Sequence, residues 1–352
     1  MILINRKAVV AYTVIACAAA LPAQQVIATA EMAQTPEMKL RSMIMVPERK
    51  HSDNDFSWNM LQAMYDKAKA TTPSLTPRAF VLAYHDKAVA GNVDAGYYYG
   101  AARMSGFGIG LGPDKEIDGY IGAAAKTGKL EALRDYAVIT YIKGTKGSDT
   151  AAYQLAKKAA DAGLPSGMVL AAEFLQAGVG TREDAVEAAL LFKKGADAGD
   201  MIGAFNMGEL LSQTNPATAM QYFMAVAASG DDRGMLAYGM AQVRGKGTAQ
   251  NEAEGVQLVQ AAAQKGNPTA QYLTAVFYSN GSHGVKQDDT AGRLYMEAAA
   301  TNGDSDAQIE FGLMNLDGDM GVPKNHDVGM EWMMKAAKQK NPRALEEMKK
   351  RM

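Results

Sequence analysis

The feature that most constrains this chain is a 37-residue pattern that occurs twice in succession, from Pro268 to Asp304 and from Ser305 to Asn341. Both copies keep one order: an Ala-Gln start, an apolar run, a glycine-containing turn that ends in Gly-Val, acidic residues, and a second run with an Ala-Ala pair. A unit of this length cannot bury its own apolar face and must stack on its neighbours. The duplication therefore predicts a solenoid of paired helices.

Glycines at the expected ends of the second helices extend this period toward the N-terminus. They are Gly91, Gly128, Gly163, Gly199, Gly230, Gly266 and Gly303, separated by 37, 35, 36, 31, 36 and 37 residues, and Lys340 takes the same place 37 residues later. A residue in left-handed backbone commonly ends a helix, and glycine adopts that conformation most easily. We therefore expect an all-α, α/α superhelical solenoid of about eight helix-turn-helix repeats of roughly 36 residues over 53–341, followed by a capping helix over 342–352.

Composition agrees with helices that pack through small residues. Hydrophobic residues make up 48% of the 352 positions but aromatic residues only 7%, so alanine, leucine and valine supply much of the apolar side-chain mass. The formal net charge is −2. A mildly acidic chain argues against nucleic acid as a partner, because such binding needs concentrated lysine and arginine.

The first 23 residues resemble a bacterial export signal. Two basic residues, Arg6 and Lys7, precede an almost wholly apolar run from Ala8 to Leu21, which is short for a membrane span. Cleavage after Ala23 or after Ala30 would release a periplasmic or secreted protein. Residues 31–52 lack periodicity and are expected to form a lead-in or tether.

A second processing route stays open, because the chain's one cysteine, Cys17, follows Val14-Ile15-Ala16. This order is similar to a lipobox, in which cleavage precedes the cysteine and a lipid is attached to it. Against this route, Ala18 to Leu21 continue the apolar run where a polar tether is expected. Contact with a membrane is expected only through such an anchor at Cys17. The rest of the chain holds no cysteine for a disulfide or a metal site.

The spacing within each repeat resembles the Sel-1-like repeat (SLR) family, an α/α solenoid related to tetratricopeptide repeats. Each copy has an alanine, then four residues later a position that is often apolar and is followed by alanine or glycine, and often a long side chain eight residues after the first alanine. One copy shows this spacing with Ala270, Thr274, Ala275 and Tyr278, and the next with Ala307, Phe311 and Gly312. The turns carry Gly-Val, and Trp332 stands four residues before an Ala-Ala pair. The resemblance covers roughly 52–341.

The resemblance implies a non-enzymatic scaffold or adaptor that binds a protein or peptide in the bacterial envelope. The roles that it implies are secretion, envelope assembly, host interaction and toxin immunity. The alternative is a periplasmic hydrolase or a cell-wall or polysaccharide-binding protein on a repeat scaffold. No Ser-His-Asp or paired-carboxylate constellation supports the hydrolase, and polysaccharide binding would need stacked aromatic residues along a groove.

A partner is expected on the concave face, which the first helices of the repeats would line. On a helical wheel, the side away from the core lies two, six and nine residues after the starting alanine position of each repeat. Those places hold the candidate contacts Tyr97, Arg134, Tyr141, Glu173, Gln176, Phe205, Glu209 and Tyr272. Aromatic residues mixed with both charge signs are typical of a protein or peptide groove.

No cofactor or metal is expected. His283 and His326 lie near acidic residues in equivalent places, but those acids are better explained as caps of the second helices. The glycine-rich run from Gly106 to Gly110 lacks a preceding strand and the Gly-Lys-Ser/Thr element of a phosphate-binding loop. We interpret it as an elongated repeat turn.

Overall fold

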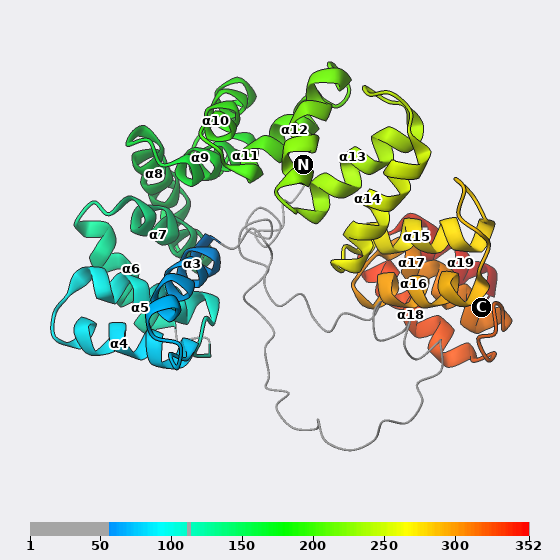
Figure 1. Cartoon of the computed structure of the whole chain (residues 1–352), viewed down its shortest axis with the longest axis horizontal. Helices are drawn as coiled ribbons and strands as arrows, with labels where there is room; N and C mark the ends of the chain where they lie inside the picture. Colours follow the sequence, from blue (N-terminus) through cyan, green and yellow to red (C-terminus); the bar gives the residue numbers. More distant parts are fainter. Residues whose placement is uncertain (1–55, 111–113, 352) are drawn as a thin grey trace. The chain divides into compact units, whose positions relative to one another are not determined.

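The computed structural model describes residues 56–110 and 114–351. The expected export signal, its cleavage sites, Cys17 and the lead-in over 31–52 lie outside these residues. The described residues form seventeen helices and no strand, which confirms the all-α solenoid (Figure 1). None of these helices combines the length and apolar character needed to cross a membrane.

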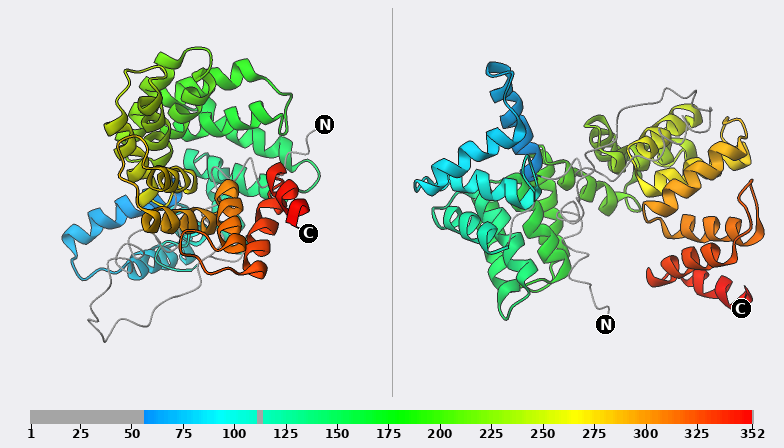
Figure 2. Two further views of the ribbon diagram at one scale, coloured as in Figure 1. Left: turned by 90° about the vertical axis from the view of Figure 1, so that its right-hand side faces the viewer. Right: turned by 90° about the horizontal axis from the view of Figure 1, so that it is seen from below.

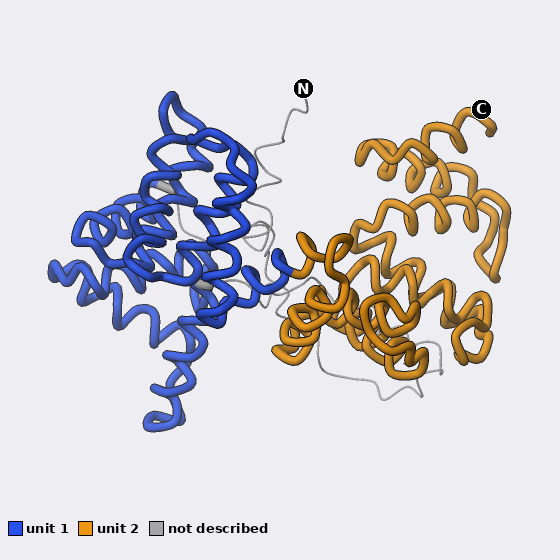
Figure 3. The backbone as a smooth tube through the Cα atoms, turned by 90° about the horizontal axis from the view of Figure 1, so that it is seen from above, with its two compact units in different colours: residues 1–25, 49–207 blue, residues 26–48, 208–352 orange. Residues whose placement is uncertain are grey.

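The chain divides into two compact units, with the division inside α11 (Figure 3). In unit 1, which contains the described residues up to Met207, the helices are α3 (Phe56–Thr71), α4 (Pro77–Val89), α5 (Val93–Ser105), α6 (Asp114–Lys126), α7 (Leu130–Lys143), α8 (Ser148–Asp161), α9 (Pro165–Ala177), α10 (Ala185–Asp197) and the start of α11 (Met201–Leu211).

Unit 2 contains the described residues from Gly208 onward. Its helices after α11 are α12 (Pro216–Ala228), α13 (Asp232–Arg244), α14 (Glu252–Gln264), α15 (Pro268–Asn280), α16 (Asp289–Thr301), α17 (Ser305–Asp317), α18 (His326–Lys338) and α19 (Pro342–Arg351). From α4 to α10 in unit 1 and from α12 to α19 in unit 2, consecutive helices pack on one another, as the two turned views also show (Figure 2). From α5 onward, the odd-numbered helix of each repeat is its first helix and the following even-numbered helix is its second.

The glycines that set the period adopt the predicted backbone. Each of the seven follows the end of a second helix with φ between +88° and +99°, and Lys340 takes the same place with φ +64°. Side-chain caps begin the second helices, since Asp288 accepts hydrogen bonds from the Ala291 amide and Asn325 from the Val328 amide. This confirms the interpretation of the acid beside His283 as a cap.

Small residues allow the two helices of a repeat to approach closely, as predicted. A Cβ atom added to Gly239 would lie 2.8 Å from the carbonyl oxygen of Gly255, and one added to Gly312 would lie 3.0 Å from that of Gly329. Both are glycine-to-glycine crossings between a first and a second helix. The same close helix packing therefore occurs in two repeats that are separated by one other repeat.

A second close approach joins consecutive repeats. The turn between the two helices of one repeat rests on the start of the second helix of the preceding repeat. Added Cβ atoms at Gly108, Gly180 and Gly247 would lie 2.6, 2.0 and 2.5 Å from the carbonyl oxygens of Pro77, Asp149 and Pro216, respectively. The glycine-rich turns therefore serve to dock one repeat on another.

The recurring Ala-Gln pair has a structural role in unit 2. Gln271 donates to the Ala263 carbonyl oxygen (3.2 Å) and accepts from the Asn302 amide (2.9 Å). One repeat later, Gln308 donates to Ala300 (3.1 Å) and accepts from Gln339 (2.9 Å). Each buried glutamine amide thus bonds to a second helix on either side of it. This series of amide bonds satisfies polar groups that would otherwise be buried without partners.

The first helix pair differs from the others. In the repeats that begin with α5, α7, α9, α13, α15 and α17, the first helix packs along its second helix. Helix α3 instead packs mainly on α5 and meets α4 where the rings of Tyr65 and Phe80 make contact. The start of α3 reaches α7 (Figure 1). There the Ser57 hydroxyl donates to an Asp135 carboxylate oxygen at 3.3 Å. Helix α3 therefore lies across two consecutive first helices.

Candidate partner-binding surfaces

Three of the predicted contact residues are buried in unit 1. Tyr97, Arg134 and Tyr141 are 0%, 5% and 2% exposed. The prediction that their side chains line an open face is therefore wrong. The helical wheel assigned one buried face to each first helix. In the structure a second face is also buried, because the next first helix packs against it.

The contacts of these side chains show this second covered side. The Tyr97 hydroxyl donates to Asp135 in α7 at 2.9 Å, and the Lys129 ammonium lies 5.2 Å from the Tyr97 ring centroid. The Tyr141 ring lies 5.4 Å from that of Phe174 in α9. Both tyrosines therefore bridge one first helix to the next.

Asp135 is the centre of a buried polar cluster formed by Ser57, Tyr97, Arg134 and Asp135. Its two oxygens accept from the Ser57 and Tyr97 hydroxyls and from Arg134 Nη1, the last at 2.7 Å. Burial, followed by the charge of Asp135, raises the pKa of Tyr97. The phenol therefore stays protonated and acts as a hydrogen-bond donor. This cluster joins α3, α5 and α7.

The other five predicted residues reach the surface to different degrees. Gln176 and Glu209 are exposed, and Glu173, Phe205 and Tyr272 are half-buried. They belong to α9, α11 and α15, with Glu173, Gln176 and Phe205 in unit 1 and Glu209 and Tyr272 in unit 2. Neither unit contains all five.

In unit 2, Tyr272 belongs to a surface formed by three consecutive odd-numbered helices. We call Tyr272, Asp306, Glu310 and Arg343 the α15–α19 surface. Arg343 Nη1 donates to Glu310 Oε1 at 2.6 Å, and this bond raises the pKa of Arg343. Burial, followed by the charge of Glu310, raises the pKa of Tyr272. The surface thus combines an aromatic hydroxyl, an arginine and two carboxylates.

Sequence reasoning found Tyr272 and missed its charged neighbours. The signal was present: Thr269, Asp306 and Arg343 are each 37 residues apart, and each directly precedes an alanine. Extending the 37-residue period by one step places Arg343 in α19 at the position that Asp306 has in α17. A residue at this position lies beside the preceding first helix. Residues 342–352 were instead expected only to cap the array, so no contact was predicted there.

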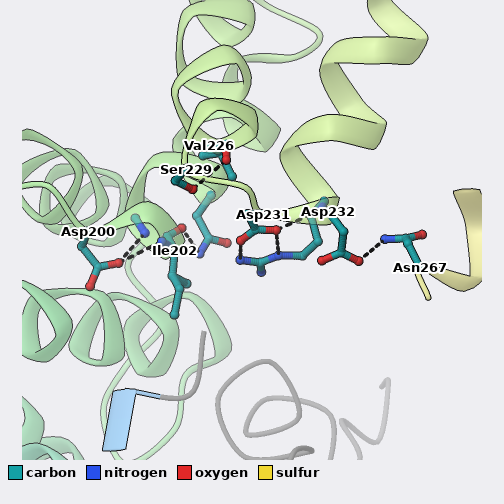
Figure 4. A network of polar contacts seen from close by, with 10 residues as sticks. Asp200, Ile202, Val226, Ser229, Asp231, Asp232 and Asn267 are labelled. Carbon is teal, nitrogen blue, oxygen red and sulfur yellow. Dashed lines mark hydrogen bonds and ion pairs between the residues drawn. The ribbon is translucent and has the colours of Figure 1, made fainter. Parts of the chain in front are cut away.

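At the starts of α13, α15 and α17, polar side chains link successive repeats. Asn267 Nδ2 donates to Asp232 Oδ2 at 2.8 Å, and the Arg233 guanidinium makes two hydrogen bonds to Asp231 (Figure 4). Further along, Thr269 donates to Asp304 at 3.1 Å, while Asp304 also accepts from the backbone amides of Asp306 and Ala307. Burial is the main reason why the pKa of Asp304 is raised.

The raised pKa of Asp304 predicts a pH effect. Because the folded state holds the Asp304 proton more tightly than the unfolded state, this carboxyl favours folding most below its unfolded pKa of about 3.9. That contribution is lost as pH rises through the folded pKa. Asn is as good an N-cap as Asp, so Asp304→Asn should change stability at pH 7 by less than about 1 kcal/mol.

Unfolding in urea between pH 3 and pH 7, for the wild-type chain and Asp304→Asn, checks this. The advantage of the variant over the wild type should increase as pH rises through the folded pKa of Asp304. Asp327→Asn, which replaces an exposed carboxylate in the first turn of α18, is the matched control. An Asp304→Asn difference that shrinks with rising pH would contradict the assignment.

Unit 1 holds a shallow cleft of about 400 Å³ between α4, α5 and α6. Most of its lining is small or apolar, including Ala88, Gly96, Gly119 and Ala123. Its acidic residue, Glu116, is engaged by Arg103 and by the Tyr99 hydroxyl. Across residues 56–110 and 114–351, no cluster of three or more His, Cys, Asp or Glu side chains could hold a metal ion.

Comparison with known proteins identifies the repeats. The model of the Sel1 repeat matches residues 130–164, 165–200, 233–267, 268–304 and 305–341, which is just over half of the chain. No curated protein matches the sequence.

Two solved structures show the same fold. The chain is 24% identical to a Sel1 repeat protein from Oxalobacter formigenes, with a TM-score of 0.62 over 70% of this chain and 100% of that one. It is 21% identical to c5321, a protective antigen present in uropathogenic Escherichia coli strains that displays an SLR fold, with a TM-score of 0.55 over 88% of this chain and 66% of that one. Together with the five matched repeats and the stacked helix pairs, they lead to one conclusion: the chain belongs to the Sel1 repeat family.

Proposed function

We propose that this chain is a scaffold of the bacterial cell envelope that binds a partner protein through the α15–α19 surface. Sel1 repeat proteins bind protein partners and are generally non-enzymatic scaffolds. The envelope location is proposed on the basis of the apolar N-terminal segment and its two preceding basic residues.

The observation that carries the choice of surface is the arrangement of Tyr272, Glu310 and Arg343 on three consecutive odd-numbered helices. Tyrosine and arginine are enriched among the residues that dominate binding energy. Arg343 and Glu310 are 44% and 29% exposed at their side chains, so the pair is accessible while remaining ordered by its hydrogen bond. A partner that carries both charge signs would match this surface.

Affinity capture tests the proposal. The chain without its first 30 residues is immobilised, incubated with envelope extract, and compared with a Tyr272→Ala/Arg343→Ala variant. We expect the variant to lose at least one protein that the unaltered chain captures, because truncation of an arginine or tyrosine at the centre of an interface typically removes about 2 kcal/mol or more of binding energy.

The matched control is Lys193→Ala/Asp197→Ala, which removes an exposed ion pair on α10. It should capture the same proteins as the unaltered chain. Circular dichroism should show equal helix content for all three proteins. Identical capture by the Tyr272→Ala/Arg343→Ala variant and the unaltered chain would remove the α15–α19 surface from consideration.

A further inference from the structure

One position in the turns between paired helices is filled by three different residue types along the array. It is the third residue after the end of the first helix, and it has positive φ after α5, α9, α13, α15 and α17. After α5, α9 and α13 it is Gly108, Gly180 or Gly247, each of which lies against a carbonyl oxygen at the start of the preceding second helix. After α15 it is His283, and after α17 it is Met320, with φ +54° and +47°.

The two larger residues also contact the preceding second helix near its start. His283 Nδ1 lies 3.2 Å from an oxygen of Glu252, the first residue of α14. The methyl carbon of Met320 would lie 3.2 Å from a Cβ atom added to Gly292, in the first turn of α16. This turn position therefore joins one repeat to the repeat before it. Of its three residue types, only histidine ordinarily changes its charge between pH 5 and pH 8.

The His283 ring is held from two sides and remains accessible to water. It makes an edge-to-face contact with Phe277 of α15, with 5.2 Å between the ring centroids. The other oxygen of Glu252 accepts from Gln250 Nε2 at 3.1 Å, which orients the carboxylate. The side chains of His283 and Glu252 are 36% and 45% exposed, so the ring can exchange its proton with solvent.

Glu252 is the group that forms an ion pair with His283 within the described part of the chain. Helix α15 carries no charged side chain, and its titratable groups are the phenols of Tyr272 and Tyr278. The first turn of α14, the turns on either side of it and the start of α16 carry further charged residues, which are Arg244, Lys246, Glu254, Lys286, Asp288 and Asp289. None of these residue types ordinarily changes its charge between pH 5 and pH 8.

We propose that the contact between Glu252 and His283 is an acid-strengthened joint, which holds the α15–α16 turn on α14 more tightly at pH 5 than at pH 8. A neutral ring can donate to the carboxylate only as an uncharged group. Protonation places a positive charge beside the carboxylate, and a hydrogen bond between two charged groups is the stronger kind. The contribution of the joint to the folded turn is therefore present toward pH 5 and lost as pH rises toward 8.

Hydrogen–deuterium exchange of the full chain, followed by mass spectrometry at pH 5 and pH 8, measures how tightly the turn is held. The reporters are the amides of Val285 and Asp288, which donate to Ser282 and Tyr278 carbonyl oxygens. After correction for intrinsic exchange rates, we expect their protection at pH 5 to exceed that at pH 8 by about twofold to fivefold, the size of an exposed ion pair. The turn that contains Gly247 is the internal control and should be equally protected at both pH values.

Two variants should each remove this pH response. His283→Met introduces the residue that the next repeat has at the same position, Met320. Glu252→Gln removes the charge of the carboxylate and keeps the size of the side chain. His326→Gln is the matched control, because His326 lies beside Asp327 of its own helix, and this variant should keep the full response of the α15–α16 turn.

A pH response that persists in His283→Met would show that another group titrates, and would overturn the proposal. Equal protection of the wild-type turn at pH 5 and pH 8 would overturn it as well. His283→Asn replaces His283→Met if the methionine variant does not fold, since asparagine also adopts left-handed backbone readily. The joint lies outside the α15–α19 surface, and Tyr272 and Arg343 are unchanged in every variant. Failure here therefore leaves the capture experiment unaffected.

Discussion

The variant Asp135→Ala is expected to lower the free energy of unfolding by about 3–5 kcal/mol, because it removes the carboxylate that faces a buried arginine. The side chains of Arg134 and Asp135 are 6% and 0% exposed, with 2.7 Å between Nη1 and Oδ1. The substitution also removes the acceptor of the Ser57 and Tyr97 hydroxyls. Urea denaturation followed by circular dichroism measures the loss.

Two further variants distinguish the cause. Asp197→Ala, which removes an exposed carboxylate paired with Lys193, should cost no more than about 1 kcal/mol. Adding Arg134→Met to Asp135→Ala should restore part of the stability, since a methionine leaves no unpaired charge in the interior. If the double variant is no more stable than Asp135→Ala, the buried charge of Arg134 is not the reason for the loss.

Gly180→Ala is expected to have the second large effect. Gly180 has φ +68°, and alanine in left-handed backbone is strained by roughly 1–3 kcal/mol. The added methyl group would also lie 2.0 Å from the carbonyl oxygen of Asp149, so the turn must move away from α8. Such overpacking typically costs a further 1–3 kcal/mol or so. The thermal unfolding midpoint should therefore fall sharply.

Gly199→Ala is the matched control in the same unit. Its φ is +89°, but no atom lies within 4 Å of an added Cβ. This variant reports backbone strain alone, so the difference between the two variants isolates the docking of the turn on α8. Equal destabilisation by Gly180→Ala and Gly199→Ala would show that the close approach contributes nothing.

The fold was predictable because the residues that determine it lie within a single repeat and recur from one repeat to the next. The seven period-setting glycines had to adopt positive φ, and they do so because each ends a second helix. Gly239 and Gly312 were expected to let the backbone of a neighbouring helix approach closely, and each faces a glycine of the second helix. Local features of this kind can be recognised from a single sequence, since every copy of the repeat reports on the same packing.

The candidate surface was harder to predict because it depends on contacts between repeats. Tyr97 and Tyr141 have the residue type and wheel position of exposed groove residues, yet the next first helix covers both. Helix α3 contacts Asp135 through Ser57 and Phe107 through Trp58, so its direction depends on side chains from three different repeats. No periodicity within one repeat specifies such a contact.

The amide bonds of Gln271 and Gln308 bear on how an array of this kind can lengthen. In each 37-residue copy the glutamine donates to the carbonyl oxygen at the same place in the preceding repeat, Ala263 or Ala300, and accepts from an amide of its own copy, Asn302 or Gln339. A third tandem copy inserted after Asp304 would find its hydrogen-bonding partners already present on both sides. Gene duplication can thus change the length of unit 2 without creating an unsatisfied buried amide, and the near-identical order of the last two copies fits a chain that has grown in this way.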